Sequence, residues 1–217
     1  MSINSFSGLT TTVVSDAMDE MGLQGCLVGL KAIGRHKEIV IGRALPVKYE
    51  RFEEGSEGKA SSYRFGGGIG RHLEAVLKVM QQGQMVLMDL GGSMEAAAWG
   101  GLASALATSK GVVGTVINGC CRDVEEIRGL EYPLWSVGIF PRRSRNKFEI
   151  GSVGDEINVC GVQVKSDDIV VGDSDGVVVI PSDRVQEVLD LASEISAREE
   201  EALRQIGGGK VVNWDDV

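Results

Sequence analysis

Two stretches of the chain repeat apolar residues every three or four positions, which is the spacing of an amphipathic helix. The first covers Thr10–Met21, where Thr11 or Thr12 can cap the helix and Gly22 can end it. The second covers 182–205 and stops at three consecutive glycines. Both patterns predict helices that bury one face and expose the other.

Short apolar runs between these helices predict β-strands separated by glycine and aspartate turns. The predicted strands are Glu38–Tyr49, Met85–Leu90, Val112–Ile117, Leu134–Phe140, Phe148–Ile150, Ile157–Val164, Ile169–Val171 and Val177–Ile180. Pro46 predicts an edge position or a bend in the first strand, because proline cannot donate a hydrogen bond to a neighbouring strand. The second and third runs are mostly apolar, which is typical of strands covered on both faces.

Two more helices are predicted among the strands, over His72–Gln82 and over the alanine-rich segment Glu95–Lys110. The second lies between two strands, and this order predicts a right-handed βαβ unit. A turn is predicted at Asn118–Gly119 and an exposed loop at 51–62. No linker is long enough to divide the chain, so we expect an α/β fold in a single domain over residues 1–217.

Composition and charge narrow the class of protein. Hydrophobic residues make up 43% and charged residues 24% of the chain, which excludes wholesale disorder. The formal net charge is −9, and an acidic surface repels phosphate, so we expect no nucleic-acid partner. No apolar run reaches the roughly 18 residues of a membrane helix. The first residues lack the pattern of a secretory signal, so we expect no membrane contact and a cytoplasmic location.

The four cysteines show no metal-binding spacing. None forms a CxxC pair, and two histidines in the chain are too few for a zinc finger. Cys120 and Cys121 are neighbours and form either a redox pair or part of the core. Adjacent strand residues point to opposite faces, which favours the core.

The strongest candidate for chemistry follows the strand at 112–117. Parallel α/β sheets bind ligands at the carboxyl ends of their strands, where this sequence places Arg122 and Asp123. Arginine presents a planar fork to a substrate carboxylate, and aspartate offers an oxygen to a hard cation such as Mg²⁺. The alternative is an ordinary helix start, with Asp123 near the positive end of the helix and Arg122 in solvent.

Glycines supply two weaker candidates. Gly91 and Gly92 follow the strand at 85–90, where their N–H groups can approach a ligand or simply form a tight turn. The run Gly66–Gly70 lacks the GxGxxG spacing and predicts a loop rather than a dinucleotide site. The chain also has no P-loop.

Several of these segments together resemble one family. The residues that carry the likeness are Val14–Ala17, Asp89–Gly92, Trp99–Leu102, Gly111–Gly119, Arg122–Glu126 and Asp173–Pro181. The chain resembles the RraA-like family over roughly residues 9–205, in order. That family includes 4-hydroxy-4-methyl-2-oxoglutarate aldolases, which also decarboxylate oxaloacetate, and regulators that bind ribonuclease E.

The resemblance implies a β/β/α swivelling-type sandwich that assembles as a homotrimer or a hexamer of two trimers, with active sites between subunits. It implies that Asp123 binds a divalent metal, Mg²⁺ or Mn²⁺, and that Arg122 binds the carboxylate of pyruvate. The backbone amides of Leu102 and Ala103 would help to hold the pyruvate. A glutamate among 199–201 would approach the site of a neighbouring subunit.

The chain departs from the aldolase pattern at one position. That pattern is an acid, twenty other residues, Arg-Asp, two more residues and a second acid. The Arg-Asp pair and Glu126 fit it, but Gly101 stands where the first acid belongs. Asp89 or Glu95 is a candidate to compensate, and we expect Gly101→Asp to raise aldolase activity.

The leading hypothesis is a divalent-metal-dependent carbon–carbon lyase, an aldolase or decarboxylase that acts on a small 2-oxo acid through a pyruvate enolate. The first alternative is a non-catalytic regulator that binds a protein partner. A further alternative is an enzyme of new specificity on the same scaffold, which Gly101, the Gly66–Gly70 loop and Trp99 near the expected cleft favour. The alternative for Trp99 is that its side chain packs in the core and does not contact a substrate.

Overall fold

The structure is a computed structural model that describes residues 6–34, 38–52, 73–144 and 147–209. The predicted loop at 51–62, beyond Phe52, and the glycine run at 66–70 lie outside the described residues. The strands are β1 (Lys31–Ala32), β2 (Val40–Arg51), β3 (Gln84–Asp89), β4 (Ala97–Trp99), β5 (Gly114–Cys121), β6 (Leu134–Ile139), β7 (Phe148–Val153), β8 (Ile157–Val159), β9 (Val162–Val164), β10 (Ile169–Gly172) and β11 (Val177–Ile180). The helices are α1 (Thr11–Glu20), α2 (Glu74–Val79), α3 (Gly101–Ser109), α4 (Val124–Gly129) and α5 (Val185–Gly207).

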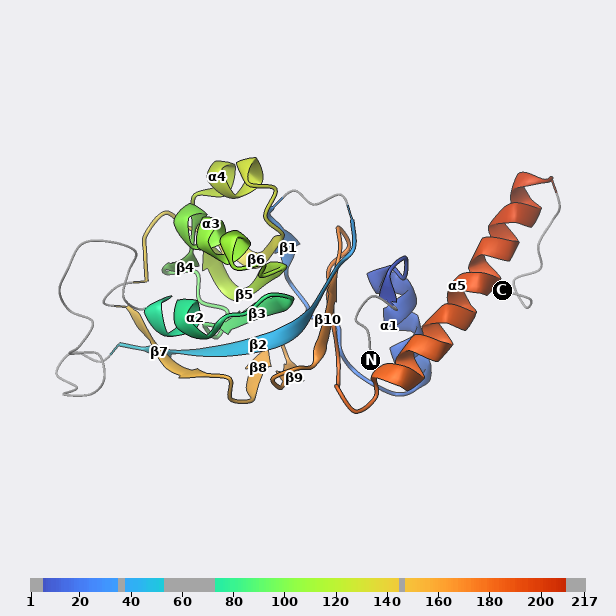
Figure 1. Cartoon of the computed structure of the whole chain (residues 1–217), viewed down its shortest axis with the longest axis horizontal. Coiled ribbons are helices and arrows are strands. Elements are labelled where there is room, and N and C mark those ends of the chain that lie inside the picture. Colours follow the sequence, from blue (N-terminus) through green and yellow to red (C-terminus); the bar gives the residue numbers. More distant parts are fainter. Residues whose placement is uncertain (1–5, 35–37, 53–72, 145–146, 210–217) are drawn as a thin grey trace.

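One mixed sheet forms the centre of the molecule (Figure 1). Its strand order is β1-β6-β5-β3-β2-β10-β11, with β4 beside β5 and β7 beside β2. The strands β2, β3, β5 and β6 are mutually parallel, so their carboxyl ends meet at one edge. At this edge Asp89 of β3 pairs with Asn118 of β5. The predicted α/β class is confirmed.

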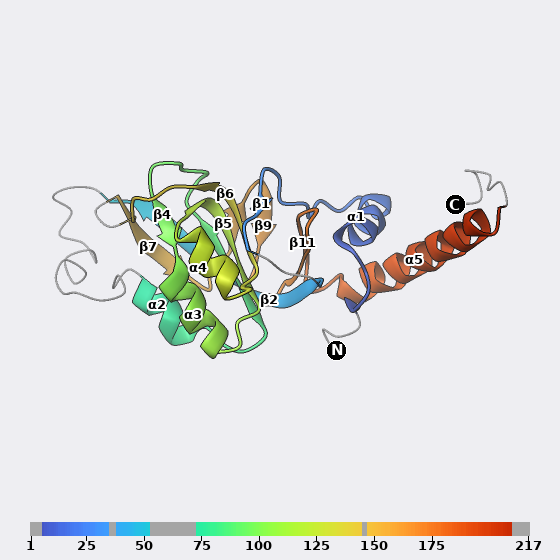
Figure 2. The same cartoon turned by 90° about the horizontal axis from the view of Figure 1, so that it is seen from above.

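Helices cover one face of the parallel strands, and the β8–β9 hairpin covers the other (Figure 1). Figure 2 shows the face covered by α2, α3 and α4 from above. Successive residues of β3 alternate between the two cores: Val86 and Met88 pack in the helix-side core, Met85 and Leu87 in the hairpin-side core. This burial on both faces explains why the strand is apolar almost throughout. The layers are those of the expected β/β/α sandwich.

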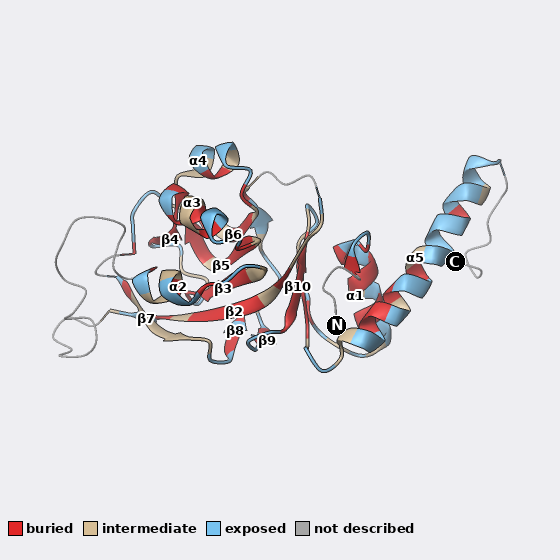
Figure 3. Cartoon of the chain, viewed as in Figure 1, coloured by how far each residue is buried: buried red, intermediate tan, exposed pale blue. Residues whose placement is uncertain are grey.

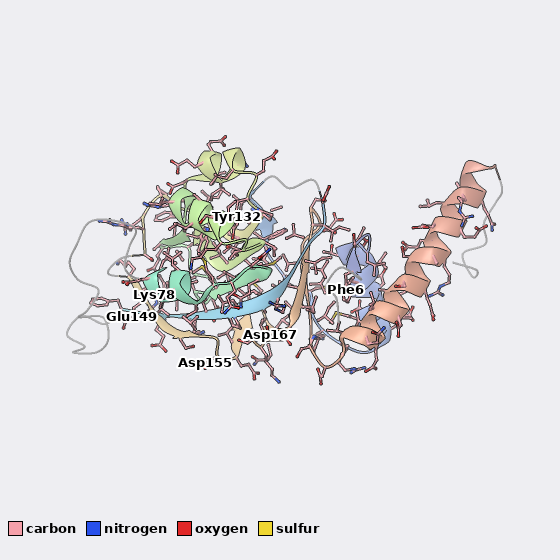
Figure 4. The ribbon with its side chains drawn as sticks, in the orientation of Figure 1. Phe6, Lys78, Tyr132, Glu149, Asp155 and Asp167 are labelled. Carbon is pink, nitrogen blue, oxygen red and sulfur yellow. The ribbon has the colours of Figure 1, made fainter. Side chains whose placement is uncertain are left out.

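The helices α1 and α5 pack together on the outer side of the β10–β11 hairpin (Figure 1). Their core includes Phe6, which lies beside α1 and is labelled in Figure 4. The outer half of α5 extends beyond this core, and Leu203 and Ile206 are exposed on it (Figure 3). Within the described ranges, no helix is long and apolar enough to cross a membrane.

The edge position predicted from Pro46 is wrong, because β2 lies between β3 and β10 inside the sheet. The proline is tolerated because two strands share that side of β2. β10 pairs with 40–43 and β7 pairs with 47–51, so Pro46 falls in the gap between them. A missing N–H costs no ladder hydrogen bond at this point.

The alanine-rich helix predicted over 95–110 is wrong in its first part. Ala97–Trp99 forms the buried strand β4 beside the end of β5, and the helix α3 begins only at Gly101. Alanine packs equally well in a buried strand and in a helix, so its pattern did not separate the two. The pairing with β5 decides the conformation.

The turn predicted at Asn118–Gly119 is also wrong, since β5 continues to Cys121. The pairing with β6 shifts register between Ile117 and Cys120, and β4 pairs with the extended end. The polar dipeptide is therefore an irregularity inside a strand. As a consequence, the strand ends four residues later than predicted, at Cys121 instead of Ile117, directly before Arg122.

Asp173 ties the N-terminus of α1 to the turn between β10 and β11. Its carboxylate accepts hydrogen bonds from the backbone N–H of Thr11 (2.8 Å) and from the Thr11 hydroxyl (2.7 Å). The N–H of Asp175 adds a third bond at 2.9 Å. Partial burial opposes ionisation, but these bonds outweigh it and hold the pKa of Asp173 below its usual range. The N-cap of α1 is Thr10, rather than the predicted Thr11 or Thr12.

We expect Asp173→Ala to lower the free energy of unfolding by roughly 1–3 kcal/mol at pH 7, because it removes charge-assisted hydrogen bonds. The folded-state pKa is depressed, so this stability is present above the unfolded pKa of about 4 and is lost as the pH falls through the folded value. Urea denaturation at pH 7 and at pH 3 measures both effects. The exposed neighbour variant Asp175→Ala is the control, and an equal effect of the two substitutions at pH 7 would contradict this role.

Candidate active site

Arg122 and Asp123 lie at the carboxyl end of β5, between the strand and α4. The backbone N–H of Arg122 donates to Trp99 O at 3.0 Å, which fixes it beside the end of β4. Asp123 has φ 58° and ψ 44°, the left-handed conformation that aspartate tolerates better than most residues. Unusual backbone of this kind is concentrated at functional sites.

The Asp123 carboxylate points at the N-terminus of α3. Its Oδ2 accepts the backbone N–H of Gly101 at 3.2 Å and lies 3.5 Å from Arg122 Nε. A Cβ at Gly100 would lie only 2.4 Å from the same oxygen, so the approach requires glycine there. The positive end of α3 stabilises the negative charge of Asp123.

The first turn of α3 presents further backbone donors at this place. Leu102 and Ala103 occupy the positions whose N–H groups have no acceptor within a helix. The side chain of Leu102 is exposed and that of Ala103 is buried. Such N–H groups bind carboxylates and phosphates. The structure therefore brings together four of the predicted site residues: Arg122, Asp123, Leu102 and Ala103.

Gly91 and Gly92 form a tight turn. Their φ angles are 62° and 73°, which favour glycine. The N–H of Gly91 donates to Asp89 Oδ1 at 2.8 Å, and the N–H of Gly92 donates to Asn118 O at 3.1 Å. Both donors therefore have acceptors inside the protein, and the assignment of these two glycines to substrate binding stays a prediction.

Asp89 also has a structural role. Its side chain is almost fully buried and forms an ion pair with Lys48 of β2. It accepts further hydrogen bonds from the N–H of Gly91 and from Asn118 Nδ2, the latter at 2.8 Å. These contacts join the carboxyl ends of three parallel strands. The carboxylate thus has its partners within the fold and does not replace the acid missing at Gly101.

Glu95, the second candidate to replace the missing acid, also has a partner away from Gly101. Its carboxylate accepts two hydrogen bonds from the guanidinium of Arg51, at 3.1 and 3.3 Å. This pair lies on the surface, and the hydrogen bonds from Arg51 lower the pKa of Glu95. Glu126 of α4 is the acid next to Gly101: a Cβ at Gly101 would lie 2.0 Å from Glu126 Oε2. The aldolase pattern places positions 101 and 126 in one motif, and the structure shows that they are neighbours in space.

The remaining side chains near β5 belong to the core. Cys120 and Cys121 are free and buried, and burial raises the pKa of both thiols, which makes them poor nucleophiles. Their burial supports the packing interpretation over a redox pair. Trp99 is also buried, and its indole N–H donates to Ser104 Oγ at 2.9 Å.

Asp123 has the chemistry to hold a hydrated cation. Across the described part of the chain, no three histidine, cysteine, aspartate or glutamate side chains are placed to share a metal ion. Asp123 is half-buried, and its Oδ1 receives no hydrogen bond or ion pair from any described residue. Mg²⁺ commonly keeps several waters and binds one or two carboxylates. A single aspartate fits such an ion, whereas it does not fit zinc, which needs more protein ligands.

Lys48→Met is expected to lower the free energy of unfolding by roughly 1–3 kcal/mol, because the buried carboxylate of Asp89 loses its charged partner. Urea denaturation at pH 7 measures the change. The control is Lys165→Met, because Lys165 lies 3.9 Å from Glu156 in an exposed pair that contributes about 0–1 kcal/mol. Equal stability changes in the two variants would argue against a structural role of the Lys48–Asp89 pair.

The chain is similar to known proteins in sequence and in fold. The sequence profile of the RraA-like family, described as Aldolase/RraA, matches residues 11–179. An uncharacterized protein of Methanocaldococcus jannaschii is 34% identical over 184 residues, which are 85% of this chain and 81% of that protein. A Thermus thermophilus protein named 4-hydroxy-4-methyl-2-oxoglutarate aldolase is 33% identical over 149 residues, which are 64% of this chain and 85% of that protein.

Solved structures share the fold. The crystal structure of Streptomyces coelicolor RraAS2, described as an unusual member of the RNase ES inhibitor RraA protein family, superposes with a TM-score of 0.79 at 25% identity. The match covers 92% of this chain and 94% of that chain. The profile match extends over more than half of the sequence and includes the end of β5 with Arg122 and Asp123. The chain therefore belongs to the RraA-like family.

Proposed function

We propose that the protein is a divalent-metal-dependent lyase that breaks a carbon–carbon bond in a small 2-oxo acid. The observation that carries the proposal is the convergence of Arg122 and Asp123 on the N-terminus of α3, where a cation, a carboxylate and unused N–H groups lie together. The name of the Thermus thermophilus relative supports an aldolase. The family also contains ribonuclease inhibitors, so a regulator without catalytic activity is the competing function.

In this proposal, some residues of the site bind the substrate carboxylate and Asp123 binds the metal. The Arg122 guanidinium forms two parallel hydrogen bonds with the substrate carboxylate, and its half-exposed side chain can reach a small ligand. The N–H groups of Leu102 and Ala103 add donors for the same carboxylate. Asp123 would hold Mg²⁺ or Mn²⁺ with its carboxylate, whose Oδ1 is left without a partner by the described residues. When bound, the metal supplies Lewis-acid stabilisation of the charge that develops on the 2-oxo oxygen as the bond breaks.

Assembly into a homotrimer or a hexamer of two trimers is part of the proposal. The outer half of α5 extends away from the core that α1 and α5 share, and it exposes Leu203 and Ile206 (Figure 3). A neighbouring subunit would cover these side chains. The acids at 199–201 of α5 would then lie near the site of that neighbour. Sedimentation velocity of the full chain distinguishes these assemblies from a monomer.

Asp123→Asn tests the metal site, because asparagine keeps the shape and tolerates the left-handed backbone but removes the charge. In the wild type we expect Mn²⁺ together with oxalate, a planar mimic of the pyruvate enolate, to raise the melting temperature. A ligand at 100 times its Kd adds about 2.7 kcal/mol to the stability of the folded state. The variant should lose this shift and all metal-dependent turnover.

Glu125→Gln is the matched control for Asp123→Asn, because Glu125 is exposed on α4 and pairs with Arg128 at 2.8 Å. It should retain the shift with Mn²⁺ and oxalate. A wild type that shows no shift and no turnover of 2-oxo acids would overturn the lyase and favour the regulator. Full activity of Asp123→Asn would overturn the metal assignment alone.

Arg122→Met is expected to raise the KM for a 2-oxo acid by roughly 10–100-fold, because a hydrogen bond to a charged group contributes about 1.5–3 kcal/mol. Arg122→Lys should recover part of the loss, since it keeps the charge without the planar fork. Steady-state assays of pyruvate release from oxaloacetate and from 4-hydroxy-4-methyl-2-oxoglutarate measure the change. An unchanged KM in the methionine variant would remove Arg122 from substrate binding.

A further inference from the structure

Basic side chains gather at the end of β2, beside β4. The Arg51 guanidinium pairs with Glu95 at 3.1 Å and lies over the ring of Phe148, 5.6 Å from its centroid. The hydrogen bonds from Arg51 lower the pKa of Glu95, and the nearby charges of Lys147 and Arg142 lower it further. Three cations thus surround one carboxylate, in a chain whose formal net charge is −9. The local charge is opposite in sign to the charge of the whole chain.

Backbone hydrogen bonds fix the segment that carries two of these cations. Ala97 of β4 donates its N–H to Arg142 O at 2.7 Å and accepts the N–H of Ser144 at 3.0 Å. The N–H of Phe52, directly after β2, donates to Lys147 O at 2.9 Å. One end of the segment is therefore held by β4 and the other by the end of β2.

This basic group lies near the proposed substrate site. β4 separates Arg142 from the end of β5, where Arg122 follows Cys121. Neighbouring strands lie about 4.8 Å apart, so the backbone of Arg142 is about 10 Å from β5, which an arginine side chain and a small ligand together can span. Figure 1 shows β4 on the same side of the molecule as β7, which starts beside the end of β2.

Two of the cations have no partner of their own. The exposed side chains of Arg142 and Lys147 form no hydrogen bond or ion pair with any described residue. Other cations at this edge of the sheet, Lys48, Arg51 and Arg122, each pair with a carboxylate. A single exposed cation binds an anion weakly, so recognition of an anion at the surface needs several cations that act together. Arg142 and Lys147 provide such a pair.

Two hydroxyl groups behind this surface favour a polar ligand at the same place. The hydroxyls of Tyr49 and Ser144 are buried and have no hydrogen-bond partner in the described part of the chain. A buried hydroxyl without a partner costs free energy, which a ligand oxygen or a bridging water would offset. Residues two positions apart in an extended chain face the same side. The Tyr49 side chain therefore lies on the side of Arg51, and the Ser144 side chain on the side of Arg142.

We propose that Arg142 and Lys147 bind a second acidic group of the substrate, beyond the carbon–carbon bond from the carboxylate that Arg122 binds. The inference rests on the proposed lyase function and adds a substrate class, a 2-oxo acid with a second carboxylate at its far end. Arg51 neutralises Glu95, so the two remaining charges act on the ligand. Arg142 makes the main contact, because a guanidinium forms two parallel hydrogen bonds with a carboxylate.

The subsite selects by charge. A second carboxylate gains charge-assisted hydrogen bonds from the two cations. A neutral group of similar size gains none and leaves both cations in water. The preference for a diacid should therefore weaken when salt is added, because exposed charges are screened.

The test uses two substrates that differ only in the group at the proposed subsite. One is 4-hydroxy-4-methyl-2-oxoglutarate, and the other is 4-hydroxy-4-methyl-2-oxopentanoate, in which a methyl group replaces the second carboxylate. Aldol cleavage of either releases pyruvate, so one assay follows both. In the wild type we expect the KM of the diacid to be lower by about tenfold or more, the usual effect of a hydrogen bond to a charged group.

Arg142→Gln should raise the KM of the diacid about tenfold and leave the KM of the methyl analogue unchanged. A change that depends on both the side chain and the carboxylate measures the interaction between them. Arg142→Lys should recover part of the preference, since it keeps the charge without the planar fork. The melting shift with Mn²⁺ and oxalate should persist in both variants, because oxalate occupies only the site at Arg122 and Asp123.

Arg143→Gln is the matched control. It removes the same charge from the neighbouring residue, but Arg143 is bridged to Ala97 and so faces the opposite side of the segment from Arg142. The control should keep the wild-type preference for the diacid. An equal loss of preference in Arg143→Gln and Arg142→Gln would reduce the effect to net charge and overturn the subsite.

The remaining outcomes separate this inference from the proposed function. A wild type that cleaves both substrates with equal KM would overturn the subsite and leave the lyase intact. An Arg142→Gln variant with the same KM as the wild type for the diacid would do so too. A wild type that cleaves neither substrate and shows no melting shift with Mn²⁺ and oxalate would overturn both.

Discussion

The approach of the Asp123 carboxylate to the first N–H of α3 is the contact on which the site depends. It requires a left-handed residue at the end of β5 and a glycine at position 100, where a Cβ would collide with the carboxylate. The helix end in turn stabilises the negative charge. Arg122 and the free amides of α3 surround this contact, so one close approach places a cation, an anion and neutral donors within a small volume.

The parallel strands hold that contact in place. Lys48, Asp89 and Asn118 link the ends of β2, β3 and β5 through a buried carboxylate with all its partners inside the fold. The acids at the sheet edge therefore fall into two kinds. Asp89 is buried and fully bonded, and it supports the structure. Asp123 and Glu126 keep carboxylate oxygens that no described residue contacts, and acids of that kind are available to a metal, a water or a substrate.

The family uses one scaffold for different tasks, as the names of its members show. The sheet and the cores of this chain would serve an enzyme and a regulator equally well, and the fold alone does not separate them. Under the proposed function, the distinction lies in the side chains beside the N-terminus of α3. Gly101 departs from the aldolase pattern at this place, and the carboxylate of Glu126 lies beside it.

The sequence by itself determined the elements that depend on local pattern. The amphipathic helices α1 and α5 and the apolar strands follow from side-chain periodicity, and the Arg-Asp pair follows from the resemblance to the family. The tertiary structure decided what depends on distant partners. β4 is a strand because β5 pairs with it, Pro46 fits inside the sheet because β10 and β7 leave a gap, and β5 extends past Asn118. Glu126 and Gly101 lie 25 positions apart in the sequence, and the packing of α3 against α4 brings them side by side.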